Sequence, residues 1–235
     1  MLIGGIQKLS LLDYPGKTCC TVFTIGCNYR CPFCHNASII QGQIQEEIQP
    51  GQTIPPEEIL AFLQKRRGLL DGVCITGGEP LLQRELEDFI HEIKALGFAV
   101  KLDTNGSYPA RLRQLIQSKA VDYVAMDVKN TPDNYGRTIG VSNFDVSPVN
   151  ESISILLSNK VPYEFRTTVV REFHTGEDLI AIARWIRGAE HYYLQSYVDS
   201  KDVLMPGLSS YTKEEMQAFL ELVRPILPSS ELRGI

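Results

Sequence analysis

The sequence contains no apolar stretch that approaches the roughly 20 residues needed to cross a bilayer as a helix. Its N-terminus has no basic segment followed by an apolar one, so it predicts no signal peptide. Acidic residues outnumber basic residues by 28 to 23, which excludes the basic surface that non-specific binding to nucleic acid requires. We therefore expect a cytoplasmic protein that acts neither on nucleic acid nor in a membrane.

Low-complexity tracts, charge blocks and internal repeats are also absent from the 235 residues. No segment has the composition of a linker, and a chain of this length can form one sizeable core. Apolar residues make up 43% and charged residues 22%, which is the balance of an ordinary globular protein. The composition therefore predicts a single domain over residues 1–235.

Short apolar segments alternate with amphipathic segments of helical spacing along most of the chain. Because a helix between two strands returns the chain to the same edge of a sheet, this alternation predicts parallel strands. About six strands are too few for the usual eight-stranded closed barrel, so we expect an α/β fold with an open, partial βα barrel. The expected strands cover residues 19–25, 72–76, 98–102, 123–126, 163–170 and 191–194, and the expected helices begin near residues 55, 86, 109, 150, 177 and 212, the last covering about 212–223.

Polar motifs follow the predicted strands at the points where the strands end. In open α/β sheets and in barrels, ligands bind beyond the C-terminal ends of the strands. We therefore expect these motifs to meet in one site. They are Gly26-Cys27, Gly77-Gly78-Glu79-Pro80, Asp103-Thr104-Asn105-Gly106 and Asp127-Val128-Lys129.

Cysteines are few, but five of the six lie within sixteen residues. Cys27, Cys31 and Cys34 have the spacing C-x3-C-x2-C in a loop over residues 26–36. Three thiolates can bind three irons of a 4Fe–4S cluster and leave the fourth iron open to another ligand. The alternative is a zinc site completed by His35 or Cys74, although zinc sites usually pair two C-x2-C units and no second unit is present.

The cysteine loop resembles the signature of the radical S-adenosylmethionine (SAM) superfamily, C-x3-C-x-φ-C with an aromatic residue at φ, here Phe33. Within this superfamily, the resemblance is greatest to the activating enzymes of glycyl radical enzymes. Residues 26–36, and residues 12–17 upstream, are similar to those of the activating proteins of anaerobic ribonucleoside-triphosphate reductase. The strand-end motifs extend the resemblance over most of the chain.

The resemblance implies that the three cysteines hold one 4Fe–4S cluster, whose open iron binds the amino and carboxylate groups of SAM. Phe33 would lie in the same cofactor site. Gly77 and Gly78 would let the backbone approach the methionine moiety, which a Cβ atom would obstruct. Glu79 would accept a hydrogen bond from the bound amino group or position its loop. A plain turn before a helix is the alternative for these residues.

By the same resemblance, Asp103, Thr104, Asp127 and Lys129 would bind the ribose hydroxyls and the carboxylate of SAM. The first three would also supply oxygens to a monovalent cation near that carboxylate. The composition of residues 103–106 also favours a simple Asx turn, which is the alternative for that motif.

Arg166 lies in the middle of a predicted strand, where an unpaired charge is rare. It points either into the barrel toward an anion or carboxylate, or to an exposed face as an ion pair with Glu164 or another acid. Some activating enzymes of the pyruvate formate-lyase type carry a SAM-binding histidine near the end of the last strand. Residues 194–198 contain no histidine, so Gln195 or Tyr197 would take that place.

The implied activity is the reductive cleavage of SAM to a 5′-deoxyadenosyl radical that removes a hydrogen atom from a backbone glycine of a partner enzyme. The expected partner is anaerobic ribonucleoside-triphosphate reductase, with reduced flavodoxin or ferredoxin as electron donor. The alternatives are a partner of the pyruvate formate-lyase type, a small-molecule radical SAM enzyme such as 7-carboxy-7-deazaguanine synthase, and a non-enzymatic zinc-binding module. Cys74 and His174 are expected to have no part in the site.

Overall fold

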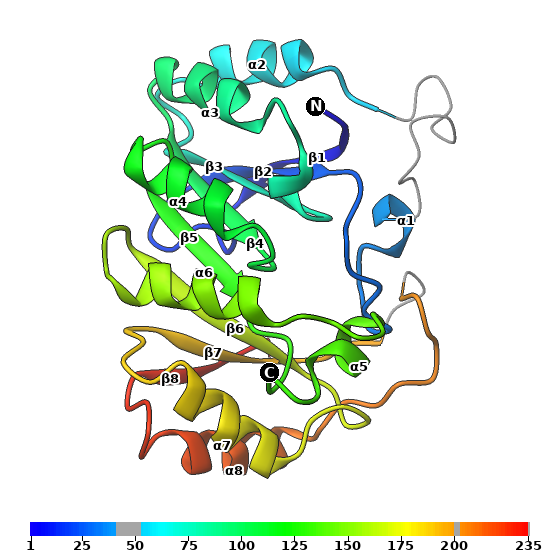
Figure 1. The fold of residues 1–235 in the computed structure, drawn as a ribbon. Helices are drawn as coiled ribbons and strands as arrows, with labels where there is room; N and C mark the ends of the chain where they lie inside the picture. The colour runs from blue at the N-terminus through cyan, green and yellow to red at the C-terminus, as the bar shows by residue number, and fades with distance from the viewer. Residues whose placement is uncertain (41–52, 200–202, 235) are drawn as a thin grey trace.

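The computed structural model describes residues 1–40, 53–199 and 203–234. Its strands form one eight-stranded sheet in which each strand pairs with the next along the chain (Figure 1). The strands are β1 (Ile3–Ser10), β2 (Cys19–Thr24), β3 (Gly72–Gly77), β4 (Ala99–Thr104), β5 (Tyr123–Asp127), β6 (Tyr163–Val169), β7 (Tyr192–Ser196) and β8 (Ser230–Arg233). β1 is antiparallel to β2, and every later pair is parallel. The expected α/β fold with an open sheet is confirmed.

Helices cover the outside of the curved sheet. The helices are α1 (Ala37–Ile40), α2 (Pro56–Gln64), α3 (Leu86–Ala95), α4 (Pro109–Gln117), α5 (Tyr135–Ile139), α6 (Ser147–Leu157), α7 (Gly176–Trp185) and α8 (Lys213–Val223), with a 3₁₀ turn at Pro80–Leu82. The short helices α1 and α5 lie on the same side of the molecule in Figure 1, apart from the outer layer of longer helices. In the described part of the chain, no helix combines the length and apolar character that a membrane crossing needs.

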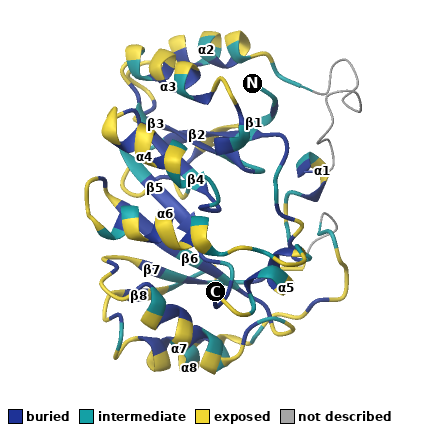
Figure 2. Ribbon diagram, viewed as in Figure 1, coloured by how far each residue is buried: buried dark blue, intermediate teal, exposed yellow. Residues whose placement is uncertain are grey.

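The central strands are buried on both faces. Val124, Ala125 and Met126 of β5 are successive residues, and all three are fully buried. Side chains that alternate between the two faces can all be buried only if helices cover one face and the barrel interior covers the other. Figure 2 shows this arrangement as buried strands with helices exposed on their outward sides.

Two strands exist beyond the six expected ones. β1 joins the edge of β2 through residues 11–18, with no helix between them, and Gln7, Lys8 and Leu9 in its second half are exposed. β8 has only four residues, Ser-Glu-Leu-Arg, and follows α8. Neither strand has the apolar run that marks the others, which is why the alternation did not predict them. The parallel part of the sheet therefore contains seven strands.

The register brings the C-terminal ends of neighbouring strands to one edge. Thr24 of β2 lies beside Gly77 of β3, and Asp127 of β5 lies beside Arg166 of β6. The hydrogen bonds between parallel strands hold these pairs in place. Motifs that are far apart in the sequence therefore meet at this edge.

Candidate functional site

A cavity of about 240 Å³ opens at the C-terminal edge of the strands. Residues from the cysteine loop and from the ends of β3 to β7 contribute to its wall. Its lining consists of Cys27, Tyr29, Cys31, Phe33, Cys34, His35, Asn36, Ile40, Thr76, Gly77, Gly78, Asp103, Thr104, Asn105, Asp127, Lys129, Arg166, Thr168 and Gln195. Of the predicted site residues, Glu79 is not part of this wall, and neither is Tyr197, the alternative to Gln195. The fold thus brings residues of five strands together with the cysteine loop.

Hydrogen bonds to α5 and within the loop, together with aromatic packing, hold the cysteine loop in place. The backbone N–H of Arg30 donates to the carbonyl of Ile139 in α5 at 2.8 Å, and the N–H of Cys34 donates to the carbonyl of Cys31 at 3.0 Å. Phe33 is only 3% exposed, and its ring packs against Phe173 at 5.7 Å between centroids. The aromatic position of the motif therefore anchors the loop by packing.

Burial controls the protonation of two thiols of the loop, those of Cys27 and Cys31. Burial raises the pKa of the Cys27 thiol to about 11, although the backbone N–H of Tyr29 opposes the shift. Burial raises the pKa of Cys31 to about 12, against the effect of the nearby Lys129 ammonium. Without a metal, the Cys27 and Cys31 thiols are therefore protonated at neutral pH, and binding of a metal would displace these two protons.

His35 lines the same cavity as the three cysteines and Cys74 does not, and neither residue forms a closed zinc site with them. Cys74 lies in β3, where its thiol is within 3.8 Å of the Lys101 ammonium and packs with Cys19 in a separate buried cluster. The ring of His35 lies 5.6 Å from that of Tyr197. Among residues 1–40, 53–199 and 203–234, no three His, Cys, Asp or Glu side chains are grouped to hold a single metal ion. Three thiols beside an open cavity fit a cluster with one exposed iron better than a closed zinc site.

The two glycines after β3 allow a close approach of two backbones. Gly77 has φ +113°, and a Cβ atom there would lie 2.3 Å from the Thr24 nitrogen. A Cβ atom on Gly78 would lie 1.9 Å from the carbonyl oxygen of Gly26. The N–H of Glu79 donates to that same oxygen at 2.8 Å. The glycines therefore join the β3 turn to the start of the cysteine loop, in addition to facing the cavity.

Glu79 is fully buried and connects two motifs. Its Oε1 accepts hydrogen bonds from the Leu81 N–H at 3.0 Å and from the Thr104 hydroxyl at 2.9 Å. Its Oε2 accepts one from the Asn105 N–H at 2.7 Å. Of the two roles expected for this residue, these contacts favour that of positioning the loop. These hydrogen bonds favour the ionised carboxylate and so lower its pKa. Burial has the larger, opposite effect and raises the pKa of the Glu79 carboxyl to about 7.

Replacing Glu79 with Gln is expected to flatten the pH dependence of stability. A carboxyl with a pKa of about 7 in the folded chain and 4.5 in the unfolded chain binds its proton more tightly when folded. Its contribution is complete below about pH 4.5 and is lost as the pH rises through about 7, so the wild type should lose roughly 2–3 kcal/mol more than the variant between about pH 5 and pH 8. Urea unfolding of the metal-free proteins measures this difference. Equal losses in both proteins would show that Glu79 does not titrate in this range, and Glu58→Gln, at an exposed position, controls for the substitution.

Five charged side chains form one network under the cavity. The Arg166 guanidinium bridges two carboxylates, from Nε to Asp127 Oδ1 at 2.9 Å and from Nη1 to Asp103 Oδ2 at 3.1 Å. Lys129 Nζ binds Asp127 Oδ2 at 2.9 Å, and Lys101 Nζ binds Asp103 Oδ1. Burial raises the pKa of the Asp127 carboxyl. The positive charges of Arg166 and Lys129 have the larger effect, so the pKa of Asp127 is lowered. Arg166 thus points into the barrel toward carboxylates and not to an exposed face.

Gln195, near the end of β7, lines the cavity, whereas Tyr197 does not. The hydroxyl of Tyr197 donates to Asp199 at 3.1 Å, and the residue is 1% exposed. Of the two candidates for the missing histidine, Gln195 therefore lies where it can reach a ligand.

Some residues near the site were not predicted. Lys101 is 1% exposed and has the character of a surface residue in the sequence alone. Asn105 donates to Asn28 at 2.9 Å, and Asn36 donates to the Gly77 carbonyl at 3.0 Å. His174, expected to have no part, is fully buried with Nε2 at 2.8 Å from the Lys129 carbonyl, so it holds the backbone of that motif. The sequence gave a signal for Asn105, which belongs to a strand-end motif, and for Asn28 and Asn36, which belong to the cysteine loop, but none for Lys101 or His174.

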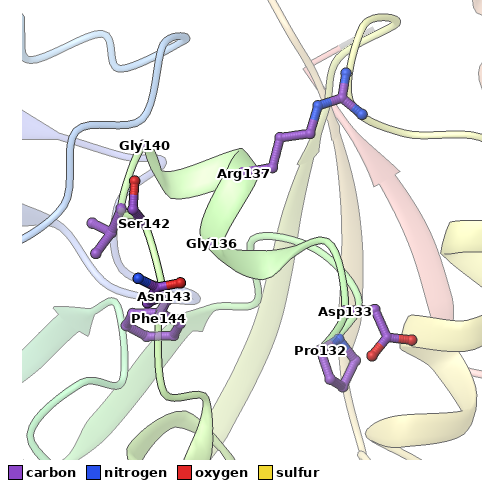
Figure 3. A pocket seen from close by; sticks show the side chains of 9 residues that line it. Pro132, Asp133, Gly136, Arg137, Gly140, Ser142, Asn143 and Phe144 are labelled. Atoms are coloured by element: carbon purple, nitrogen blue, oxygen red, sulfur yellow. The ribbon is translucent and has the colours of Figure 1, made fainter.

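A larger hollow of about 550 Å³ lies on α5 and the loop that follows it. Its lining includes none of the predicted site residues. Figure 3 shows that Arg137 extends away from Ser142 and Asn143, so the polar groups do not converge. Arg137 instead donates to the Glu172 carbonyl at 3.0 Å. The cavity at the strand ends is therefore the candidate active site.

Comparisons with known proteins show which proteins the chain is similar to. The model of the radical SAM superfamily matches residues 21–186. A Methanocaldococcus jannaschii protein with the provisional name glycyl-radical enzyme activating enzyme is 35% identical over 100% of this chain and 96% of its own length. The 7-carboxy-7-deazaguanine synthase of Koribacter versatilis is 31% identical over 68% of this chain and 65% of its own. The fold matches Streptococcus suis SuiB bound to S-adenosylmethionine with a TM-score of 0.70 at 12% identity, covering 89% of this chain and 48% of SuiB.

Proposed function

This chain belongs to the radical SAM superfamily, and we propose that it activates a glycyl radical enzyme, most specifically anaerobic ribonucleoside-triphosphate reductase. The observation that carries the proposal is the convergence of Cys27, Cys31 and Cys34 with the three other strand-end motifs on one cavity. Because all eight strands belong to one sheet, the chain is proposed to act as a single domain.

The side chains of the cavity fit the proposed cofactors. The three thiolates would hold the cluster, and the ammonium of Lys129 would face the carboxylate of SAM. Asp103 would accept hydrogen bonds from the ribose, since each carboxylate oxygen has two acceptor positions. When bound, the reduced cluster supplies one electron to the sulfonium of SAM, which yields methionine and a 5′-deoxyadenosyl radical. The protein aligns SAM with its target and limits the access of water.

The proposed target is a backbone glycine of the partner. The deoxyadenosyl radical takes a hydrogen atom from the glycine Cα, which gives 5′-deoxyadenosine and leaves the unpaired electron on the partner. Similarity over the full length of the M. jannaschii relative supports a protein substrate. The sequence of residues 26–36 supports the reductase, and the lack of a histidine at residues 194–198 weighs against a pyruvate formate-lyase type. Reduced flavodoxin or ferredoxin is the proposed electron donor.

Electron paramagnetic resonance with two partners tests this assignment. The cluster-loaded, reduced protein and SAM are mixed without oxygen with anaerobic ribonucleoside-triphosphate reductase or with pyruvate formate-lyase. We expect a glycyl radical signal on the reductase and none on the lyase. The assignment fails if 5′-deoxyadenosine accumulates while the reductase gains no signal.

A small-molecule radical SAM reaction is the second candidate, supported by the similarity to 7-carboxy-7-deazaguanine synthase over two thirds of the chain. A protein-free, low-molecular-mass extract of cells separates the two functions. If this extract accelerates the formation of 5′-deoxyadenosine as much as the reductase does, a small-molecule substrate is favoured. No acceleration by the extract is expected from an activating enzyme.

A further inference from the structure

We propose that Arg166 takes the place of the monovalent cation that the family resemblance implies, so that this chain binds SAM without such an ion. The inference rests on the proposed function because it concerns the SAM carboxylate. It follows from the partners of three residues, Asp103, Thr104 and Asp127, that were expected to hold the cation.

Each carboxylate oxygen of the two aspartates already faces a cationic group of the protein. Arg166 binds Oδ2 of Asp103 and Oδ1 of Asp127, at 3.1 and 2.9 Å. Lys101 binds the other oxygen of Asp103, and Lys129 binds the other oxygen of Asp127 at 2.9 Å. The guanidinium therefore joins the two carboxylates that a bound metal ion would have to bridge.

The third expected ligand is also engaged. The Thr104 hydroxyl donates to Glu79 Oε1 at 2.9 Å and accepts from the Gly106 N–H at 3.1 Å. A metal ion that displaced either contact would leave a buried polar group without a partner, which is unfavourable. The Thr104 hydroxyl is thus engaged by partners within the protein itself.

The charges of the network argue against a further cation. Two carboxylates face three cationic side chains, Lys101, Lys129 and Arg166, so this group carries one net positive charge. Glu164 does not change that sum, because Arg233 neutralises it through contacts of 2.8 and 3.1 Å. A metal ion would add a second positive charge in a largely buried place, where repulsion is weakly screened. The existing positive charge already attracts the carboxylate of SAM.

The sheet holds the guanidinium in position. Arg166 of β6 is the register partner of Asp127 of β5, and Asp103 lies on β4, the next strand. The Arg166 side chain is 13% exposed. A planar guanidinium that binds two carboxylates is more directional than a metal ion and cannot lose its charge by deprotonation. The network is therefore a permanent part of the fold.

Calorimetric titration of the cluster-loaded wild type with SAM tests the proposal. The titration is repeated in potassium, sodium and N-methylglucamine salts of equal ionic strength. We expect the Kd for SAM to change by less than about twofold among them. A Kd at least about tenfold lower in potassium or sodium would overturn the role of Arg166. A saturable thallium(I) site detected by nuclear magnetic resonance at stoichiometric occupancy would overturn it as well.

Substitutions at Arg166 give a second readout. Arg166→Met should weaken SAM binding by about tenfold or more in N-methylglucamine and should regain affinity when potassium or guanidinium is added. Arg166→Lys should remain independent of the salt cation. Arg113→Met, which removes an exposed arginine paired with Glu151, is the matched control. If Arg166→Met fails to fold, the wild-type titration decides alone. Absence of SAM binding in every salt would refute the proposed function, whereas binding that needs potassium would refute only the inference about Arg166.

Discussion

Cys31→Ala is expected to yield a folded protein that holds no intact 4Fe–4S cluster and forms no 5′-deoxyadenosine above background. The loop supplies only three thiolates to the cavity, so the loss of one leaves two cluster irons without a protein ligand. Iron and sulfide analysis after anaerobic reconstitution, followed by chromatography of the SAM cleavage products, measures both effects.

Cys74→Ala is the matched control for that experiment. Cys74 is buried like Cys31, but it packs with Tyr14 and Cys19 and is not part of the cavity wall. We expect this variant to keep its iron and its SAM cleavage, at some cost in stability from the lost packing. Loss of the cluster in Cys74→Ala together with its retention in Cys31→Ala would show that the ligands have been assigned wrongly.

Gly78→Ala is expected to destabilise the protein by about 3 kcal/mol and to prevent stable cluster assembly. The added Cβ atom would lie 1.9 Å from the oxygen and 2.5 Å from the carbon of the Gly26 carbonyl. These are backbone atoms at the start of the cysteine loop, so the clash can be relieved only by moving the loop. Urea unfolding and iron content measure the two consequences.

The control for Gly78→Ala is Gly5→Ala in β1. No heavy atom lies within 4 Å of a Cβ atom at that position, so we expect a change of at most about 0.5 kcal/mol and full iron content. If Gly78→Ala matched this control in both measurements, the close contact between the β3 turn and the cysteine loop would not be needed for the site.

The sequence predicted the central strands because each is a run of apolar residues bounded by polar or glycine residues. It also predicted that the polar motifs meet, since the ends of parallel strands lie at one edge. Thr76, Asp103 and Asp127 line the same cavity although they belong to three strands. This part of the site follows from local patterns and a general rule of topology.

Other parts of the site depend on contacts that no local pattern reveals. Lys101 is in a strand buried on both faces, so alternation does not show that its ammonium turns inward to Asp103. His174 reaches the carbonyl of Lys129 from a distant segment, 45 residues along the chain. Glu79 has the position of a SAM ligand in the motif, yet its oxygens bind Thr104 and the backbone. Such pairings become visible only when the strands are placed side by side.

The transfer of a hydrogen atom from a partner glycine to SAM tests the central claim most directly. Anaerobic ribonucleoside-triphosphate reductase is prepared with deuterium on its glycine Cα atoms and mixed with the reduced, cluster-loaded protein and SAM. We predict that mass spectrometry will find one deuterium in each 5′-deoxyadenosine formed and that a glycyl radical will appear in equal amount. Formation of 5′-deoxyadenosine without deuterium, in the presence of the labelled reductase, would contradict the claim.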